Sequence, residues 1–241
     1  GIRVPYVKVR IVKMGEGAAI LRDCEVDEIG MVLVGGPGVA GGYLDASQDK
    51  GAFLPNGFFV SGDLGSMDAQ GYLRISGRQK DLIIRGGHNI EPGQIEEALL
   101  QSPCVALAAA VGKPDAHAGE LPIAYVELHP GMLVSTAELL SFASERIPER
   151  PAVPKEIFIL DKLPLTSVGK PMKHVLQMDA AKRVFEEALQ ALTCSWSIDI
   201  TNTGGSGLHT KLQLRKASES DRQTADKILS AYSVPYDITV D

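Results

Sequence analysis

The sequence is poor in cysteine and has no long apolar run. Its three cysteines, Cys24, Cys104 and Cys194, are widely spaced and form no CxxC pair, which argues against a disulfide framework or a zinc site. No apolar stretch approaches the roughly 20 residues that a membrane-spanning helix requires, and the chain does not open on a charged-then-apolar signal segment. We therefore expect reduced thiols, no metal site, no transmembrane segment and a cytoplasmic location.

Positive charge is also scarce. The chain has 24 Lys and Arg residues against 30 Asp and Glu, a formal net charge of −6. Domains that bind nucleic acid cluster their basic residues on one face, whereas here they are spread, so no nucleic-acid partner is expected. The 44% hydrophobic content of these 241 residues is enough for one large packed domain or two small ones.

The first 76 residues predict short strands separated by glycine-rich turns, with no helical periodicity between them. We expect strands at 4–12, 31–34, 58–60 and 72–75.

From residue 81 the pattern changes to alternating strands and helices. Pro92 suits the first position of a helix over 92–101, which Asn89 or Glu91 could cap, and Ser135 with Glu138 predicts a capping box opening a helix to about residue 146. A one-sided apolar pattern predicts a long helix over 172–192. We expect strands at 81–84, 105–111, 123–128 and 156–160.

Residues 195–241 predict a β-β-α-β tail. Its expected strands are 196–200, 208–214 and 237–240, and its helix is 219–232, capped by Ser218 and Asp221. The half-buried strands need a hydrophobic partner, most simply the neighbouring domain. A linker is the alternative for 201–207. The fold class is therefore α+β, with a β-rich N-terminal piece, a small α/β domain and this tail.

Four motifs in a fixed order carry the functional signal. They are Ser61-Gly62-Asp63, Gly77-Arg78-Gln79-Lys80-Asp81, Gly86-Gly87-His88-Asn89-Ile90-Glu91-Pro92, and Pro164-Leu165-Thr166-Ser167-Val168-Gly169-Lys170. In this order the chain resembles the C-terminal third of the AMP-forming acyl-CoA synthetases, the superfamily that also contains peptide-synthetase adenylation domains and beetle luciferases. The resemblance covers roughly residues 1–185.

The resemblance implies a domain organisation. Residues 1–79 would end a large N-terminal domain, 80–194 would be the mobile C-terminal lid domain, and 195–241 would be an extension outside the family pattern. The rest of the N-terminal domain would carry the triphosphate loop and the acyl pocket, neither of which is seen between Gly1 and Leu54. We therefore expect a fragment that is inactive by itself.

Asp63 and Arg78 are the candidate nucleotide-binding residues. A carboxylate can accept two hydrogen bonds from adjacent ribose hydroxyls, and we expect Asp63 on a loop after a strand. The planar donors of Arg78 could hold ribose or phosphate nearby. Spacing alone favours a turn aspartate at Asp63, and a solvated arginine is the alternative for Arg78. The resemblance implies that both residues contact AMP.

The next candidates lie at the predicted domain boundary. The resemblance implies that Lys80 is the hinge, and that the Gly86-Gly87 loop enters the active site in the second half-reaction and lines the pantetheine tunnel. Two glycines permit positive φ angles and close approach by a substrate, although the pattern alone indicates only a turn from strand to helix. His88 is a lone loop histidine that we do not assign as a base.

Lys170 is the candidate catalytic residue. An ammonium on a flexible stem can neutralise a carboxylate and the α-phosphate together, although an isolated Gly-Lys pair by itself more often indicates a lysine at a helix start. The resemblance implies that Lys170 is the adenylating lysine. Pro171 departs from the family pattern, which usually has an apolar residue there, and could stiffen the loop. Lys155 matches, more weakly, a basic residue near the CoA phosphates.

These residues predict an ATP-dependent acid–thiol ligase that forms an acyl-adenylate and then an acyl-CoA thioester, using Mg²⁺, ATP, CoA and a carboxylic acid. One alternative is an adenylation domain that passes its acyl group to a carrier protein; Gly204-Gly205-Ser206 superficially resembles a carrier attachment site but lacks its context. A non-catalytic interaction module is the other alternative.

Overall fold

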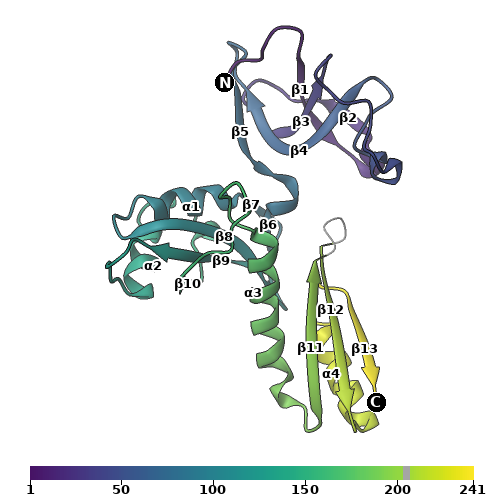
Figure 1. Ribbon diagram of the computed structural model, residues 1–241, viewed down its shortest axis with the longest axis vertical. Helices are drawn as coiled ribbons and strands as arrows, with labels where there is room; N and C mark the ends of the chain where they lie inside the picture. Colours follow the sequence, from purple (N-terminus) through teal and green to yellow (C-terminus); the bar gives the residue numbers. More distant parts are fainter. Residues whose placement is uncertain (203–206) are drawn as a thin grey trace. The chain divides into compact units, whose positions relative to one another are not determined.

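The computed structural model describes residues 1–202 and 207–241. The chain forms two compact units, Gly1–Asp81 and Leu82–Asp241, and each is described by itself. Figure 1 shows a first unit built on strands without an α-helix and a second unit of sheets covered by helices, which is the predicted α+β class. Among the described helices, none is long and apolar enough to cross a membrane.

The first unit is an antiparallel sheet in the order β2-β1-β3-β4-β5. Its strands are β1 (Lys8–Met14), β2 (Ile20–Asp23), β3 (Gly30–Gly35), β4 (Phe58–Met67) and β5 (Leu73–Arg78). Its short 3₁₀ turns are η1 (Glu16–Ala18), η2 (Ala46–Asp49) and η3 (Gln79–Asp81). A small core forms where Val12, Met31 and Leu33 are buried against partly buried neighbours such as Val60.

Two details at the start of this unit differ from the sequence prediction. Tyr6 has a left-handed φ of 66°, which breaks extended structure, so the first strand begins at Lys8 instead of residue 4. The short strand β2 was not predicted, because it buries little: Leu21 is 69% exposed. Cross-strand pairing with β1 holds it in place.

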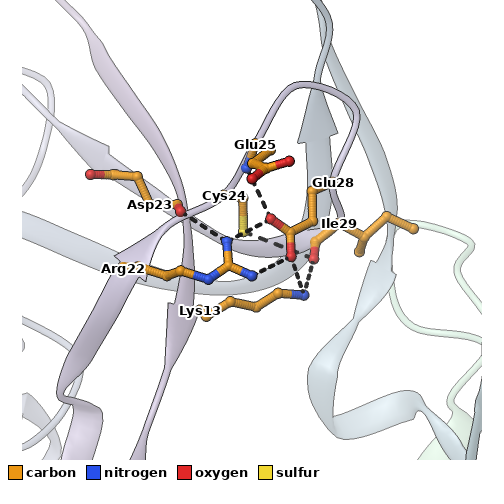
Figure 2. Close-up of polar contacts among 7 residues, drawn as sticks. All are labelled: Lys13, Arg22, Asp23, Cys24, Glu25, Glu28 and Ile29. Carbon is orange, nitrogen blue, oxygen red and sulfur yellow. Dashed lines mark hydrogen bonds and ion pairs between the residues drawn. The ribbon is translucent and has the colours of Figure 1, made fainter.

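A network of charged groups joins β1, β2 and the turn before β3 (Figure 2). Glu28 accepts two hydrogen bonds of 2.7 Å from the Arg22 guanidinium and one of 2.9 Å from the Glu25 amide. Lys13 lies 3.4 Å from the Glu28 carboxylate and donates to the Ile29 carbonyl. These donors, Arg22 foremost, hold the pKa of Glu28 below its usual value.

The second unit contains a mixed sheet in the order β10-β9-β6-β7, with β8 also paired to β9. Its elements are β6 (Ile83–Arg85), β7 (His88–Ile90), α1 (Pro92–Leu100), β8 (Val105–Asp115), β9 (Gly119–Leu128), α2 (Thr136–Ser144), η4 (Arg150–Ala152), β10 (Glu156–Leu160), α3 (Lys173–Ala188) and η5 (Leu189–Ala191). Only β9 and β10 pair in parallel in this sheet.

The apolar run in β8 follows from burial on both faces. Ala108 and Ala110 lie in a core with α1 and α2, whereas Ala109 and Val111 lie in a second core with α3. Because successive strand residues point to opposite faces, each face needs its own apolar set.

The tail forms a separate sheet in the order β11-β12-β13. Its elements are β11 (Ser195–Asn202), β12 (Leu208–Arg215), α4 (Glu219–Leu229) and β13 (Tyr236–Val240). β12 pairs antiparallel with β11 and parallel with β13, as the β-α-β connection requires. This sheet finds its hydrophobic partner in α3: Ala181 and Phe185 share a core with Leu212, Leu214 and Leu229.

The helix starts test the capping predictions. The capping boxes of α2 and α4 are both present, so those predictions are confirmed. Pro92 occupies the first turn of α1 as expected. The predicted cap by Asn89 or Glu91 is wrong, because Asn89 lies in β7 and Glu91, at the N-cap position, makes no side-chain capping bond.

Candidate functional site

Asp63 and Arg78 lie directly opposite each other on the paired strands β4 and β5. Arg78 Nε donates a 2.9 Å hydrogen bond to Asp63 Oδ1. The two side chains are 51% and 35% exposed, so both charges remain open to a ligand. The pair presents carboxylate and guanidinium groups side by side, which suits hydroxyl and phosphate groups of a nucleotide.

The prediction that Asp63 lies on a loop is wrong. Ser61, Gly62 and Asp63 lie inside the ten-residue strand β4, which extends beyond its apolar start because β5 pairs with it as far as Arg78. Gly62 has a φ of 75°, and the Ser61 hydroxyl donates to the Val32 carbonyl and accepts from the Asp63 amide. This local kink sets the direction of the Asp63 side chain.

Lys80 lies in η3, which directly follows Arg78. It is exposed, and the boundary between the two compact units falls just after Asp81. Its position suits a residue that absorbs backbone rotation.

Gly86 and Gly87 form a two-residue turn between β6 and β7. Their φ angles are 54° and 84°, as a tight hairpin turn requires. The predicted direct turn from strand to helix is wrong, because the strand His88–Ile90 intervenes. Its pairing is explained by Ile83 and Ile90, which face each other and are both fully buried.

The hairpin is held by bonds from several elements. Glu120 accepts a 2.8 Å hydrogen bond from the Ile84 amide, Arg85 donates to the Pro151 carbonyl, and the Gly86 amide donates to the Ala118 carbonyl. Burial raises the pKa of the Glu120 carboxyl, opposed by the bond from Ile84. These bonds anchor the β6 side of the hairpin to other parts of the second unit.

His88 and Lys155 are both exposed. His88 opens β7, whereas Lys155 immediately precedes β10, and β9 and β6 lie between these two strands in the sheet. The sheet order therefore separates Lys155 from the hairpin.

Lys170 lies in an exposed loop between β10 and α3. The Lys170 amide donates to Thr166 Oγ1 and its carbonyl accepts from the Thr166 amide. Gly169, with a φ of 79°, closes the turn by donating to the Thr166 carbonyl. Thr166 therefore stabilises the turn of the loop through its hydroxyl and its backbone groups. Lys170 remains exposed.

Two carboxylates near this loop, Glu127 and Glu96, were missed by the sequence analysis. Glu127 in β9 accepts from the Leu163 amide and from Lys162, and Glu96 in α1 pairs with Lys173. No local pattern marks them, because each carboxylate meets partners far away in the sequence.

Within residues 1–202 and 207–241 no group of three or more His, Cys, Asp and Glu side chains could hold a metal ion. Gly204-Gly205-Ser206, the superficial carrier-like motif, lies outside the described residues.

Sequence comparisons give the same picture. Residues 94–170 match the family of AMP-binding enzyme C-terminal domains. A marinolic acid–CoA ligase from a Pseudoalteromonas species is 43% identical over 230 residues, covering 95% of this chain and 35% of that protein. An indoleacetate–CoA ligase from Aromatoleum aromaticum is 37% identical over 187 residues, covering 78% of this chain and 36% of that protein.

Solved structures agree with these relatives. ATP-bound MatB from Rhodopseudomonas palustris superposes with a TM-score of 0.67 at 34% identity, covering 73% of this chain and 34% of that one. O-succinylbenzoate CoA synthetase (MenE) from Bacillus subtilis, in complex with an acyl-adenylate intermediate, gives a TM-score of 0.64 at 34% identity, covering 72% and 34%.

The chain spans about a third of the length of the relatives it matches. A match to 95% of the chain has to include most of residues 195–241, so the tail is shared with the marinolic acid–CoA ligase. The matched domain family, the CoA-ligase relatives and the adenylate-bound structural neighbour identify the chain as a C-terminal portion of the AMP-forming acyl-CoA synthetase superfamily.

Proposed function

We propose that the protein to which this region belongs is an ATP-dependent acid–thiol ligase. In the first step a substrate carboxylate attacks the α-phosphate of ATP, which forms an acyl-adenylate and releases pyrophosphate. In the second step the thiol of CoA attacks the acyl carbonyl and AMP leaves. The observation that carries this proposal is the Lys170 loop, whose backbone is fixed by Thr166 while its ammonium group is exposed.

Each candidate residue has a role in this reaction. Lys170 neutralises the carboxylate and α-phosphate as they approach, Asp63 accepts hydrogen bonds from the ribose hydroxyls, and Arg78 donates to the nucleotide. The Gly86-Gly87 hairpin faces the pantetheine arm in the second step, with Lys155 toward the CoA phosphates. Mg²⁺ would accompany the ATP phosphates and offset part of their negative charge.

The domain organisation is part of the proposal. Residues 1–79 belong with an N-terminal domain that supplies the acyl pocket, and 80–194 form a lid that rotates about Lys80. One arrangement presents Lys170 and the other presents the Gly86-Gly87 hairpin. The 241-residue chain alone is expected to be inactive because it lacks the triphosphate loop.

The experiment is Lys170→Ala in the full-length ligase, with the two half-reactions measured separately. We expect the rate of adenylate formation, measured as pyrophosphate release, to fall about 10²–10³-fold. This is the usual effect of removing one preorganised charge-stabilising group. Thioester formation from a supplied acyl-adenylate should be largely spared. Lys182→Ala, an exposed lysine on α3 paired with Glu186, is the matched control. Equal loss in both half-reactions would show that Lys170 is structural.

The acceptor is tested in the same assay. CoA should discharge the acyl-adenylate, with AMP release and a thioester product. Discharge only by a carrier protein would favour the alternative of a peptide-synthetase type adenylation domain.

A further inference from the structure

Hydrogen bonds within the Lys170 loop determine its conformation, whereas bonds from its two ends to other elements determine its position on the domain. Inside the loop, Thr166 pairs with Lys170, and the Met172 amide donates to the Pro164 carbonyl. These bonds close a turn, yet they do not fix where the turn lies on the domain. Its location depends on bonds from its two ends to other elements.

Glu127 holds the N-terminal end of the loop, at Lys162 and Leu163. This carboxylate in β9 is only 7% exposed as a residue. Its Oε2 accepts from the Leu163 amide at 3.0 Å, and its Oε1 lies 2.6 Å from Lys162 Nζ. Leu163 is itself buried, so this end is part of the core.

Glu96 holds the C-terminal end of the loop, at Lys173. Its Oε1 lies 2.8 Å from Nζ of Lys173, the first residue of α3. The same oxygen accepts a 2.8 Å hydrogen bond from the Ala110 amide in β8. Both charged side chains are about four-fifths covered, at 23% and 20% exposure. One carboxylate therefore ties α1, β8 and the start of α3 together.

The link from Lys173 to Lys170 is short and stiff. Only Pro171 and Met172 separate them. The proline ring fixes one backbone angle, and Pro171 also pairs with Leu165 across the loop. A displacement of Lys173 is therefore expected to displace the Lys170 backbone as well, because the short link between them has little freedom to compensate. Misplacement of a catalytic group by about 1 Å can cost on the order of 10²-fold in rate.

We infer that Glu96, acting through Lys173, is a positioning residue for adenylate formation. The ion pair sets the location of the Lys170 ammonium and touches neither nucleotide nor acyl group itself. This inference rests on the proposed function for the role of Lys170. It predicts a defect confined to the first half-reaction, because the Gly86-Gly87 hairpin is held by a different carboxylate, Glu120.

The test compares Lys173→Met with Lys182→Met. Both lysines are on α3 and both form an ion pair, but the pair of Lys182 with Glu186 is long, exposed and confined to the helix. In the full-length ligase we expect Lys173→Met to lower kcat for adenylate formation about tenfold, with KM for ATP changed less than about twofold. Thioester formation from a supplied acyl-adenylate should stay within about twofold. Lys182→Met should change neither.

Two further variants separate positioning from folding. Lys173→Arg keeps the charge and should restore most of the adenylation rate. Glu96→Gln keeps an acceptor for the Ala110 amide but loses the charge, so it should match Lys173→Met. The double variant should be no slower than either single variant, because both remove the same interaction.

A second readout uses the 241-residue chain itself. Hydrogen exchange of the Lys170 backbone amide, measured by NMR, should be about fivefold faster in Lys173→Met than in wild type or Lys182→Met, as expected for a loosened loop. Unchanged exchange, or an equal loss in both half-reactions, overturns the inference. A wild-type ligase that forms no adenylate overturns the proposed function instead, and the exchange measurement distinguishes the two.

Discussion

The ion pair between Asp63 and Arg78 is a poor source of stability, and we propose it as part of the nucleotide site. Half-exposed pairs contribute about 0–1 kcal/mol, because water screens the charges. The same sheet contains a similar cross-strand pair, Arg10 with Asp23, whose side chains are 32% and 64% exposed. A cross-strand arginine–aspartate ion pair is therefore not unique to Asp63 and Arg78. The feature that distinguishes this pair is its position on the kinked strand β4.

Arg78→Lys in the full-length ligase should weaken AMP binding about tenfold, because a lysine cannot reproduce the planar fork of donors. The free energy of unfolding should change by less than about 1 kcal/mol. Titration calorimetry with AMP and urea unfolding measure the two effects.

Arg10→Lys is the matched control, since Arg10 makes two hydrogen bonds to Asp23 in the same sheet. It should leave AMP affinity unchanged. An equal loss of affinity in both variants would remove Arg78 from the nucleotide site.

At the scale of elements, the β6–β7 hairpin combines an open turn with firm anchors. A Cβ added at Gly86 or Gly87 would meet no atom within 4 Å. The glycines are therefore needed for their positive φ angles, because packing within the domain places no demand on them.

Gly87→Ala should slow thioester formation at least tenfold while leaving adenylate formation nearly unchanged. Its backbone strain costs about 1 kcal/mol, and the added methyl group would project toward the pantetheine arm. Gly131→Ala is the control, since Gly131 has a φ of 79° and equally open surroundings. It should cost similar stability and affect neither step. Equal rates in both variants would exclude the hairpin from the CoA site.

The tail helix α4 depends on its capping box. Ser218 Oγ accepts from the Asp221 amide at 3.1 Å and donates to its carboxylate. Ser218→Ala should lower the free energy of unfolding by about 1 kcal/mol, measured by urea unfolding of this chain. Ser220→Ala, in the same helical turn, should change it by far less. Similar losses would mean that the cap contributes little.

The pH dependence of this cap has a definite sign. Hydrogen bonds from Ser218 and Thr193 hold the pKa of Asp221 below its usual value. A carboxyl group with a depressed folded pKa adds stability above its unfolded pKa, and that stability is lost as the pH falls through the folded value. Asp221→Asn should therefore make unfolding less sensitive to acid.

At the scale of the whole molecule, α3 serves two cores. Ala180 and Leu176 pack on the central sheet, whereas Ala181 and Phe185 pack on the tail sheet. The tail is therefore built into the second compact unit through this helix, and removing it would expose a buried aromatic side chain. The separate division at residues 194 and 195 stays a prediction.

Lys80→Pro in the full-length ligase should abolish one half-reaction and leave the fold intact. The proline ring fixes φ near −65°, so a hinge that changes φ between two arrangements would be locked in one of them. Each half-reaction rate and the thermal unfolding curve are the measurements.

Lys50→Pro is the control, because Lys50 is exposed and its φ of −60° already suits proline. It should leave both half-reactions unchanged. Unimpaired rates in Lys80→Pro would remove Lys80 as the hinge and point to Gln79 or Asp81.

Local patterns predicted much of this fold. Capping serines, Pro92 and the one-sided apolar pattern of α3 act within a few residues, so the sequence shows them directly. The short strands β2 and β7 were missed for the opposite reason. Three or four residues carry little periodic signal, and pairing with a neighbouring strand decides whether they form.

The sequence by itself determined the class of fold, the order of the motifs and the family to which they belong, because these are properties of residue type and spacing. Tertiary structure decided which groups meet. Asp63 faces Arg78 only through strand pairing, and Glu96 reaches Lys173 only because α1 and α3 both pack on β8. Contacts between residues distant in the chain depend on the packing of whole elements, which no local pattern encodes.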